Sequence, residues 1–177
     1  MVDTLKTIAQ KAGRNFDSPP LHLWHPPLSG DIDIQIDREG KWTHDGAPIK
    51  RESIVRLFAS ILRREDDDEY YLVTPGEKWR IRVEVLPLIV TDVEQVQEEP
   101  GKPFLQLTLN TGKKVSVDSE QSLYLEQSME NIAAVKLPHG LAALFSRNAW
   151  YRLVDMAQIK EGRACVQSGS EIFFLEP

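Results

Sequence analysis

The sequence predicts an α+β protein with two small lobes, each made of an antiparallel sheet and a packed helix. The first observation is a pattern that occurs twice: residues 51–84 and residues 147–176 each read as an amphipathic helix, a turn and two strands. The second is that apolar and polar residues alternate in the strand-forming segments, whereas the strand–helix rhythm of a parallel fold is absent. We therefore expect an N-terminal helix and proline-rich arm in residues 1–29, a first lobe in 30–97 and a second lobe in 98–177.

The composition is that of a globular protein, with 177 residues of which 41% are hydrophobic and 27% charged. The net charge of -6 opposes general binding to nucleic-acid phosphates. The single cysteine, Cys165, excludes an internal disulfide and is expected to be a buried strand residue. Because no apolar stretch is long enough to span a membrane, we expect a cytoplasmic protein with neither a membrane nor a nucleic-acid partner.

The first residues of the chain are expected to form a short amphipathic helix, because Val2, Leu5 and Ile8 fall at helical spacing. Residues 15–29 contain four prolines, which favour an extended arm that apolar side chains hold on the protein surface.

The first lobe is expected to open with a strand in residues 31–37, where three isoleucines alternate with polar residues. A second strand is expected in 41–44, followed by a turn at Asp45-Gly46. A helix then follows, with an apolar stripe from Ile54 to Leu62.

The acidic run 65–69 is interpreted as a solvated turn. Strands in 70–74 and 79–85 are expected on either side of a Pro75-Gly76 turn. Pro87 limits the next segment to an edge strand or a bulge, because proline has no backbone N–H to give to a ladder.

The second lobe is expected to be mostly strand, with a short helical piece in 141–145 and a longer helix in 148–159. The expected strands are 105–109, 115–117, 123–125, 132–137, 163–168 and 171–175. The last of these is apolar and is expected to be buried.

Ordered motifs across most of the chain, roughly from Trp24 to Pro177, resemble a bacterial family known as domain-of-unknown-function family 1285. The motifs are Gly30-Asp31-Ile32-Asp33, Gly40-Lys41-Trp42, Asp45-Gly46-Ala47-Pro48-Ile49, Leu57-Phe58, Tyr71-Leu72-Val73-Thr74-Pro75 and Glu77-Lys78-Trp79-Arg80-Ile81, with weaker matches at Asn110-Thr111-Gly112 and Gly140-Leu141-Ala142-Ala143. The resemblance implies a two-lobed α+β fold with a repeated motif. It implies no established activity. The role that we expect from the resemblance is signalling or regulation.

One surface in the first lobe is a candidate for ligand binding. On a strand, Lys78, Arg80 and Arg82 share one face, and two arginines at this spacing can present adjacent forks to a carboxylate or a phosphate. Thr74 and Glu77 flank the preceding turn and complete the candidate set. The alternative is a solvated strand face whose cations pair with acids such as Asp92 or Glu94.

A metal site is a weaker hypothesis. His22 and His25 are three residues apart, and His44 and His139 could join them in space, but His-x-x-His in a proline-rich arm lacks the rigid support that zinc ligands need. We therefore predict no metal and no cofactor.

The function predicted from these patterns is a binding or regulatory module that recognises a small anionic ligand or a protein partner at the region between the lobes. No catalytic residue is assigned. The alternative is a small hydrolase that uses Glu77 or an Asp31/Asp33 carboxylate with Lys78. A third interpretation is a structural protein that dimerises, and the patterns leave monomer and homodimer both open.

Overall fold

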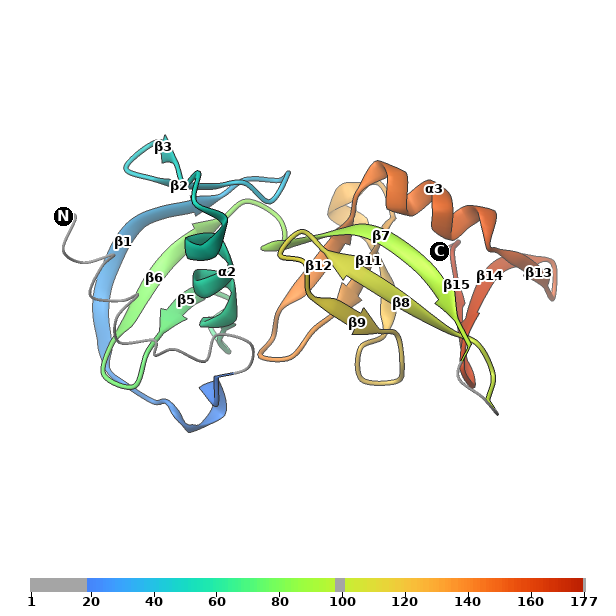
Figure 1. The fold of residues 1–177 in the computed structure, drawn as a ribbon, viewed down its shortest axis with the longest axis horizontal. Helices are drawn as coiled ribbons and strands as arrows, with labels where there is room; N and C mark the ends of the chain where they lie inside the picture. Colours follow the sequence, from blue (N-terminus) through green and yellow to red (C-terminus); the bar gives the residue numbers. More distant parts are fainter. Residues whose placement is uncertain (1–18, 98–100, 177) are drawn as a thin grey trace. The chain divides into compact units, whose positions relative to one another are not determined.

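A computed structural model describes residues 19–97 and 101–176, so the helix expected in residues 1–14 lies outside the described part. The described residues form two compact units. The first runs to Pro87 and includes His139–Leu141, and the second contains the remainder. The lobe boundary expected between residues 97 and 98 falls inside the second unit. Within the described ranges the protein is mostly β, with two six-stranded sheets, a smaller third sheet and two α-helices, which confirms the α+β class (Figure 1).

The first unit holds a six-stranded sheet in the order β3-β2-β1-β6-β5-β4. Its elements are η1 (Leu21–Leu23), β1 (Leu28–Ile36), β2 (Trp42–His44), β3 (Ala47–Pro48), α2 (Glu52–Ser60), β4 (Leu62–Arg64), β5 (Tyr70–Val73) and β6 (Lys78–Val83). The expected alternation in β1 is confirmed, because Ile34 and Ile36 are completely buried. Trp42 from β2 is also buried, and its ring lies 6.1 Å from that of Phe58 on α2.

Strands β1 and β6 are parallel neighbours, which the expectation of purely antiparallel sheets did not include. The register places Asp31 beside Arg80 and Gln35 beside Arg82. Parallel neighbours need a long crossover connection. Here the connection is the segment from β2 to β5, which includes α2.

Helix α2 ends at Ser60, whereas its apolar stripe predicted a helix through Leu62. Ile61 and Leu62 continue the apolar stripe, and both are fully buried. Leu62, however, already belongs to β4 and pairs with β5. The Val73 N–H donates to the Ile61 carbonyl at 2.9 Å, so strand pairing replaces the next helical turn. An apolar run of this length does not distinguish the two structures.

Residues His139–Leu141 belong to the first unit through β4. The Arg64 N–H donates to the His139 carbonyl at 3.0 Å. Gly140 has a φ of +70°, and a Cβ there would lie 2.9 Å from the Arg64 carbonyl oxygen. Glycine is therefore required at this close approach.

The second unit contains the other two sheets, in the orders β10-β11-β12-β7-β8-β9 and β13-β14-β15. Its elements are β7 (Leu88–Val96), β8 (Phe104–Leu109), β9 (Lys114–Ser116), β10 (Leu123–Glu126), η2 (Gln127–Met129), β11 (Ile132–Lys136), β12 (Ala142–Phe145), α3 (Arg147–Asp155), β13 (Gln158–Lys160), β14 (Arg163–Ser168) and β15 (Glu171–Phe174). Cys165 is buried in β14, as expected.

Two helical expectations in this unit are wrong. Residues 141–145 were expected to be helical, but Ala142–Phe145 forms the buried strand β12 between β11 and β7. A strand buried on both faces reads as a continuous apolar run and loses the alternation that would identify it. Helix α3 ends at Asp155 and not at Ile159, because Gln158–Lys160 pairs with β14 as β13.

Strand β7 is an interior strand, so of the two alternatives expected after Pro87 the edge position is not the one found. Pro87 precedes the first residue of the strand, where its missing N–H interrupts no ladder. A register shift between Val90 and Asp92 supplies the bulge that was the other expectation. The final strand β15 is half-buried throughout, not buried. None of the helices in the described ranges combines the length and the apolar composition needed to cross a membrane.

Candidate functional site

The candidate surface is built on β1 and β6, two parallel neighbours of the first unit. Arg80 on β6 binds Asp31 on β1 through two bonds, Nε–Oδ1 at 2.8 Å and Nη2–Oδ2 at 3.0 Å. Two residues further along each strand, Arg82 pairs with Asp33. We call these four side chains the paired face.

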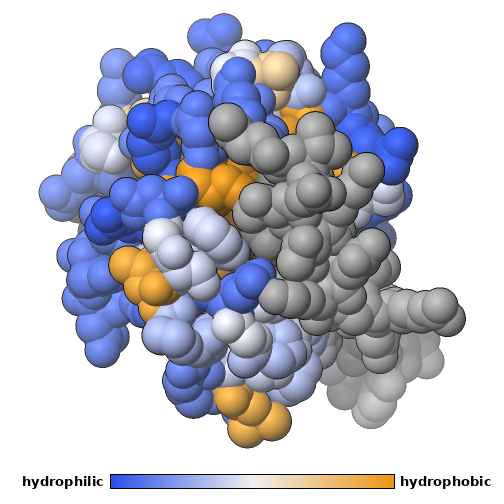
Figure 2. Space-filling model, turned by 90° about the vertical axis from the view of Figure 1, so that its left-hand side faces the viewer, coloured by the Kyte–Doolittle hydropathy of each residue, from blue (hydrophilic) through white to orange (hydrophobic). Residues whose placement is uncertain are grey.

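The paired face is charged on both strands and accessible to solvent. The side chains of Arg80 and Arg82 are 41% and 69% exposed. In Figure 2, which faces the left-hand side of the view in Figure 1, the coloured residues are mostly hydrophilic and the apolar residues lie in separate groups. The hydrogen bond from Arg80 holds the pKa of Asp31 below its usual range, and the same bond raises the pKa of Arg80. Both groups therefore stay charged at neutral pH.

The carboxylates that neutralise this strand are not those expected from the sequence. Asp92 and Glu94 were the expected partners, but both lie on β7 in the second unit. Asp92 pairs with Arg152, and Glu94 binds Lys114 with a distance of 2.7 Å between Oε1 and Nζ. The expectation of antiparallel sheets concealed the true partners, because it did not place β1 beside β6.

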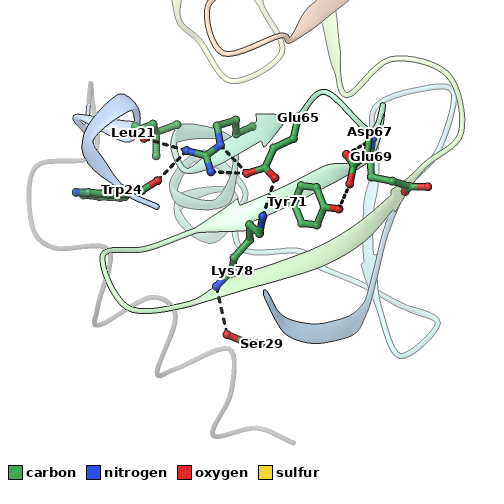
Figure 3. A network of polar contacts seen from close by, with 9 residues as sticks. Leu21, Trp24, Ser29, Glu65, Asp67, Glu69, Tyr71 and Lys78 are labelled. Carbon is green, nitrogen blue, oxygen red and sulfur yellow. Dashed lines mark hydrogen bonds and ion pairs between the residues drawn. The ribbon is translucent and has the colours of Figure 1, made fainter. Parts of the chain in front are cut away.

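Lys78 has a different environment from the two arginines, although all three share the face of one strand. Its Nζ lies 2.6 Å from Oε2 of Glu65 and 4.6 Å from the centre of the Tyr71 ring. The Lys78 side chain is only 17% exposed. Figure 3 shows the ammonium group between the Glu65 carboxylate and the Tyr71 ring. Lys78 is therefore held inside a network and does not project into solvent.

Glu65 lies at the centre of this network, because it also binds Arg63. Arg63 donates from Nε to Oε1 of Glu65 at 3.1 Å and from Nη1 to the carbonyls of Leu21 and Trp24 at 3.0 and 2.9 Å. Partial burial acts to raise the pKa of Glu65. The hydrogen bonds from Lys78 and Arg63 together lower it by more, so the pKa lies below its usual value. The network keeps Glu65 ionised and ties the proline-rich arm to β4. We call Arg63, Glu65 and Lys78 the Glu65 network.

A second carboxylate of the acidic run is fixed by Tyr71. The Tyr71 hydroxyl donates to Oδ2 of Asp67 at 2.6 Å, which raises the pKa of Tyr71 to about 12 and lowers that of Asp67. Residues 66–69 are exposed, as expected for a solvated turn, but Glu65 is half-buried. The solvated-turn interpretation is therefore wrong for Glu65. The sequence signal for the role of Glu65 was Arg63, which lies two residues earlier on β4, while Glu65 follows the end of that strand.

The two remaining candidate residues form the turn between β5 and β6. Thr74 is fully buried, and its Oγ1 accepts from the Glu77 N–H at 3.1 Å. The Thr74 N–H donates to the Glu77 carbonyl at 2.9 Å. Thr74 therefore supports the turn that positions Lys78 and has no exposed surface for a ligand.

Of the residues named for a hydrolase, Lys78, Asp31 and Asp33 are held in ion pairs, whereas Glu77 lies in the turn before β6. Lys78 binds Glu65, and Asp31 binds Arg80. General-acid catalysis at neutral pH needs a carboxyl group with a raised pKa, whereas the pKa of Asp31 is lowered. Residues 19–97 and 101–176 contain no group of three or more His, Cys, Asp or Glu placed to hold a metal ion.

Comparisons with known proteins agree with the fold. Residues 19–85 match the N-terminal domain of the domain-of-unknown-function family DUF1285, and residues 87–175 match its C-terminal domain. No curated protein matches the chain. A crystal structure of a DUF1285 family protein from Silicibacter pomeroyi DSS-3 is 36% identical, with a TM-score of 0.86 over 96% of this chain and 93% of that chain.

A second solved structure, of a DUF1285 family protein from Shewanella baltica OS155, is 32% identical. Its TM-score is 0.58, over 70% of this chain and 91% of that chain. The two family models together span nearly all of the described residues, and both similar structures carry the same family name. The chain belongs to the DUF1285 family.

Proposed function

We propose that the protein is a binding module with a regulatory role, in signalling, and that it recognises its partner through the paired face. The observation that carries the proposal is the pair of exposed Asp–Arg contacts, Asp31–Arg80 and Asp33–Arg82, side by side on parallel strands. A cytoplasmic location is part of the proposal and is tested by cell fractionation.

The paired face can change partners at little cost. Exposed ion pairs contribute little to stability, since water screens both charges. An incoming group can therefore replace Asp31 as the partner of Arg80 without unfolding the strand pair. The Glu65 network differs, because its three side chains are at most 24% exposed. We assign ligand contact to Arg80 and Arg82, and a supporting role to Lys78 and Thr74.

The charges on the paired face favour a protein partner over a small anion. A small anion that binds Arg80 remains close to the carboxylates of Asp31 and Asp33, and the net charge of -6 also repels it. A protein segment with both acidic and basic side chains can pair with both strands at once. The small anionic ligand is the second possibility and is an arm of the test.

The test compares Arg80→Ala/Arg82→Ala with Arg152→Ala. Arg152 is a matched control because it is an exposed arginine that pairs with an aspartate, Asp92, in the second unit. Affinity capture from cells of the native organism should yield a partner with wild type and with Arg152→Ala, and lose it with the double variant. A thermal-shift screen of nucleotides and acidic metabolites tests the small anion. If the double variant still captures the partner, and if it shows the same thermal shifts as wild type, the proposal is wrong.

We also propose that the chain contains two related copies of one supersecondary unit. Helix α2 is followed by the antiparallel strands β4, β5 and β6, and helix α3 by β13, β14 and β15, which supports this proposal. The last strand of the first copy carries Lys78, Arg80 and Arg82, whereas that of the second carries Ile172, Phe173 and Phe174. Superposition of the two segments in the solved family structures tests it, and unrelated helix-to-strand geometry would contradict it.

A further inference from the structure

The second unit contains a cavity, open to solvent, that the proposed function does not use. Its volume is about 380 Å³, and it lies where the turn between β14 and β15 meets the start of β8 and the end of β9. Oγ of Ser168 accepts from the Leu105 N–H at 2.9 Å and donates to the Val117 carbonyl at 2.6 Å. The Gly169 N–H donates to the Pro103 carbonyl at 2.9 Å. These bonds join the three-stranded sheet to the six-stranded sheet, so the walls are formed before any ligand binds.

The lining of the cavity is partly apolar and partly rich in oxygen. The half-buried Phe104 supplies most of the apolar surface, because Val117 is only 3% exposed. The polar surface comes from two carboxylates and four serines, which are Asp118, Glu171, Ser116, Ser119, Ser168 and Ser170. Among the described residues that line the cavity there is no Lys, Arg or His. The lining is therefore rich in hydrogen-bond acceptors and carries negative charge without a compensating cation.

Both carboxylates retain capacity to accept hydrogen bonds. Oδ1 of Asp118 accepts from the N–H groups of Glu120 and Gln121 at 2.8 and 2.7 Å, which fixes the carboxylate on its turn. Those bonds leave Oδ2 for a ligand. Glu171 accepts from the Ser170 hydroxyl at 3.4 Å, a long contact that a stronger donor would replace.

We propose that this cavity binds an organic cation, a primary ammonium or guanidinium group on an alkyl chain. Such a group carries several N–H donors and no acceptor, which is the complement of the oxygen-rich lining. Its charge strengthens the bonds to Asp118 and Glu171, and its alkyl chain packs against Phe104. The site belongs to the second unit and does not depend on the paired face. The cation can come from a free amine or from a lysine or arginine side chain of another protein.

An NMR titration of the full chain with n-pentylamine, 1-pentanol and pentanoate tests this proposal. The three probes have similar chain lengths and differ in charge. The amide signals of Leu105 and Gly169 report on the walls. We expect saturable shifts of these signals with pentylamine, and binding at least about tenfold weaker with pentanol and pentanoate. Equal responses to all three probes, or no response to pentylamine, would overturn the proposal.

A pair of charge-neutralising variants locates the effect. Asp118→Asn/Glu171→Gln should weaken pentylamine binding by about tenfold or more, and the asparagine keeps the acceptor that holds the turn. Glu52→Gln/Asp66→Asn is the matched control, because it removes the same charge from exposed positions in the first unit. If the control weakens binding as much, the effect is one of net charge and the site is rejected.

The source of the cation is distinguished by a lysine peptide and its norleucine analogue. Tighter binding of the lysine peptide than of pentylamine indicates a protein side chain, whereas tighter binding of pentylamine indicates a free amine. Binding of the norleucine peptide equal to that of the lysine peptide contradicts recognition of a cation.

Discussion

Lys78 and Glu65 form an ion pair in which both side chains are largely buried, with Nζ 2.6 Å from Oε2. Glu65 is a residue of the acidic turn, and Lys78 opens the strand that carries Arg80 and Arg82. The pair therefore connects the turn after β4 to the start of β6, and through Arg63 it also holds the proline-rich arm. It makes the paired face part of a fixed scaffold.

Replacement of Glu65 by glutamine should destabilise the protein by about 1–3 kcal/mol, because Arg63 and Lys78 would remain partly buried without a counter-charge. Urea unfolding monitored by tryptophan fluorescence measures the change. Asp66→Asn is the control, since this neighbour is exposed, and should change the free energy of unfolding by less than about 0.5 kcal/mol. Equal effects of the two substitutions would show that Glu65 has no special role.

The contribution of Glu65 should also depend on pH. Its pKa is lowered in the folded protein from a usual value of 4.5, so the unfolded chain binds the proton more readily. The stabilisation is therefore complete above pH 4.5 and is lost as pH falls through the folded pKa. The free energy of unfolding of wild type should fall more steeply below this pH than that of Glu65→Gln. Parallel pH profiles would contradict this sign.

Tyr71 should titrate well above the usual tyrosine pKa of 10. The hydrogen bond to Asp67 favours the neutral phenol and raises the pKa of Tyr71 to about 12. The stabilisation from this group is thus present below pH 10, the usual tyrosine value, and is lost as pH rises through about 12. Tyrosinate absorbance should show a late titration in wild type that moves to lower pH in Asp67→Ala. A Tyr71→Phe variant that retains the late titration would assign it to another residue.

Arg63→Ala should loosen the arm. The substitution removes both bonds to the Leu21 and Trp24 carbonyls together with one partner of Glu65. Hydrogen exchange at the Trp24 amide, which donates to the Leu21 carbonyl, should become faster than in wild type. Arg64→Ala is the control, because Arg64 is exposed and pairs with Asp68. Faster exchange in both variants would indicate a general loss of stability.

The strands could be predicted wherever one face is buried. Residues 31–37 and 105–109 alternate, and both form strands because alternation directly reflects a half-buried sheet. Leu62 and Ala142 were assigned to helices, since fully buried residues in short apolar runs carry no period that separates helix from strand. The pairing of β1 with β6 was not predictable, because the residues that pair are 49 apart in sequence.

Only the part of the candidate site that lies on β6 could be predicted from the sequence. The alternation of Lys78, Arg80 and Arg82 identified the charged face, but the sequence does not record which acids meet it. Asp31 and Asp33 were considered as possible hydrolase carboxylates, and Glu65 was interpreted as part of a solvated turn. Their roles depend on contacts between strands that are distant in the chain.

Site-specific photo-crosslinking in living cells tests the central claim most directly. A photoreactive residue at Gln35, beside Arg82 on the paired face, should give one discrete crosslinked species. This species should disappear in Arg80→Ala/Arg82→Ala and should be absent when the photoreactive residue stands at the exposed Glu130 of the second unit. No discrete species from Gln35, or one that persists in the double variant, would contradict recognition through the paired face.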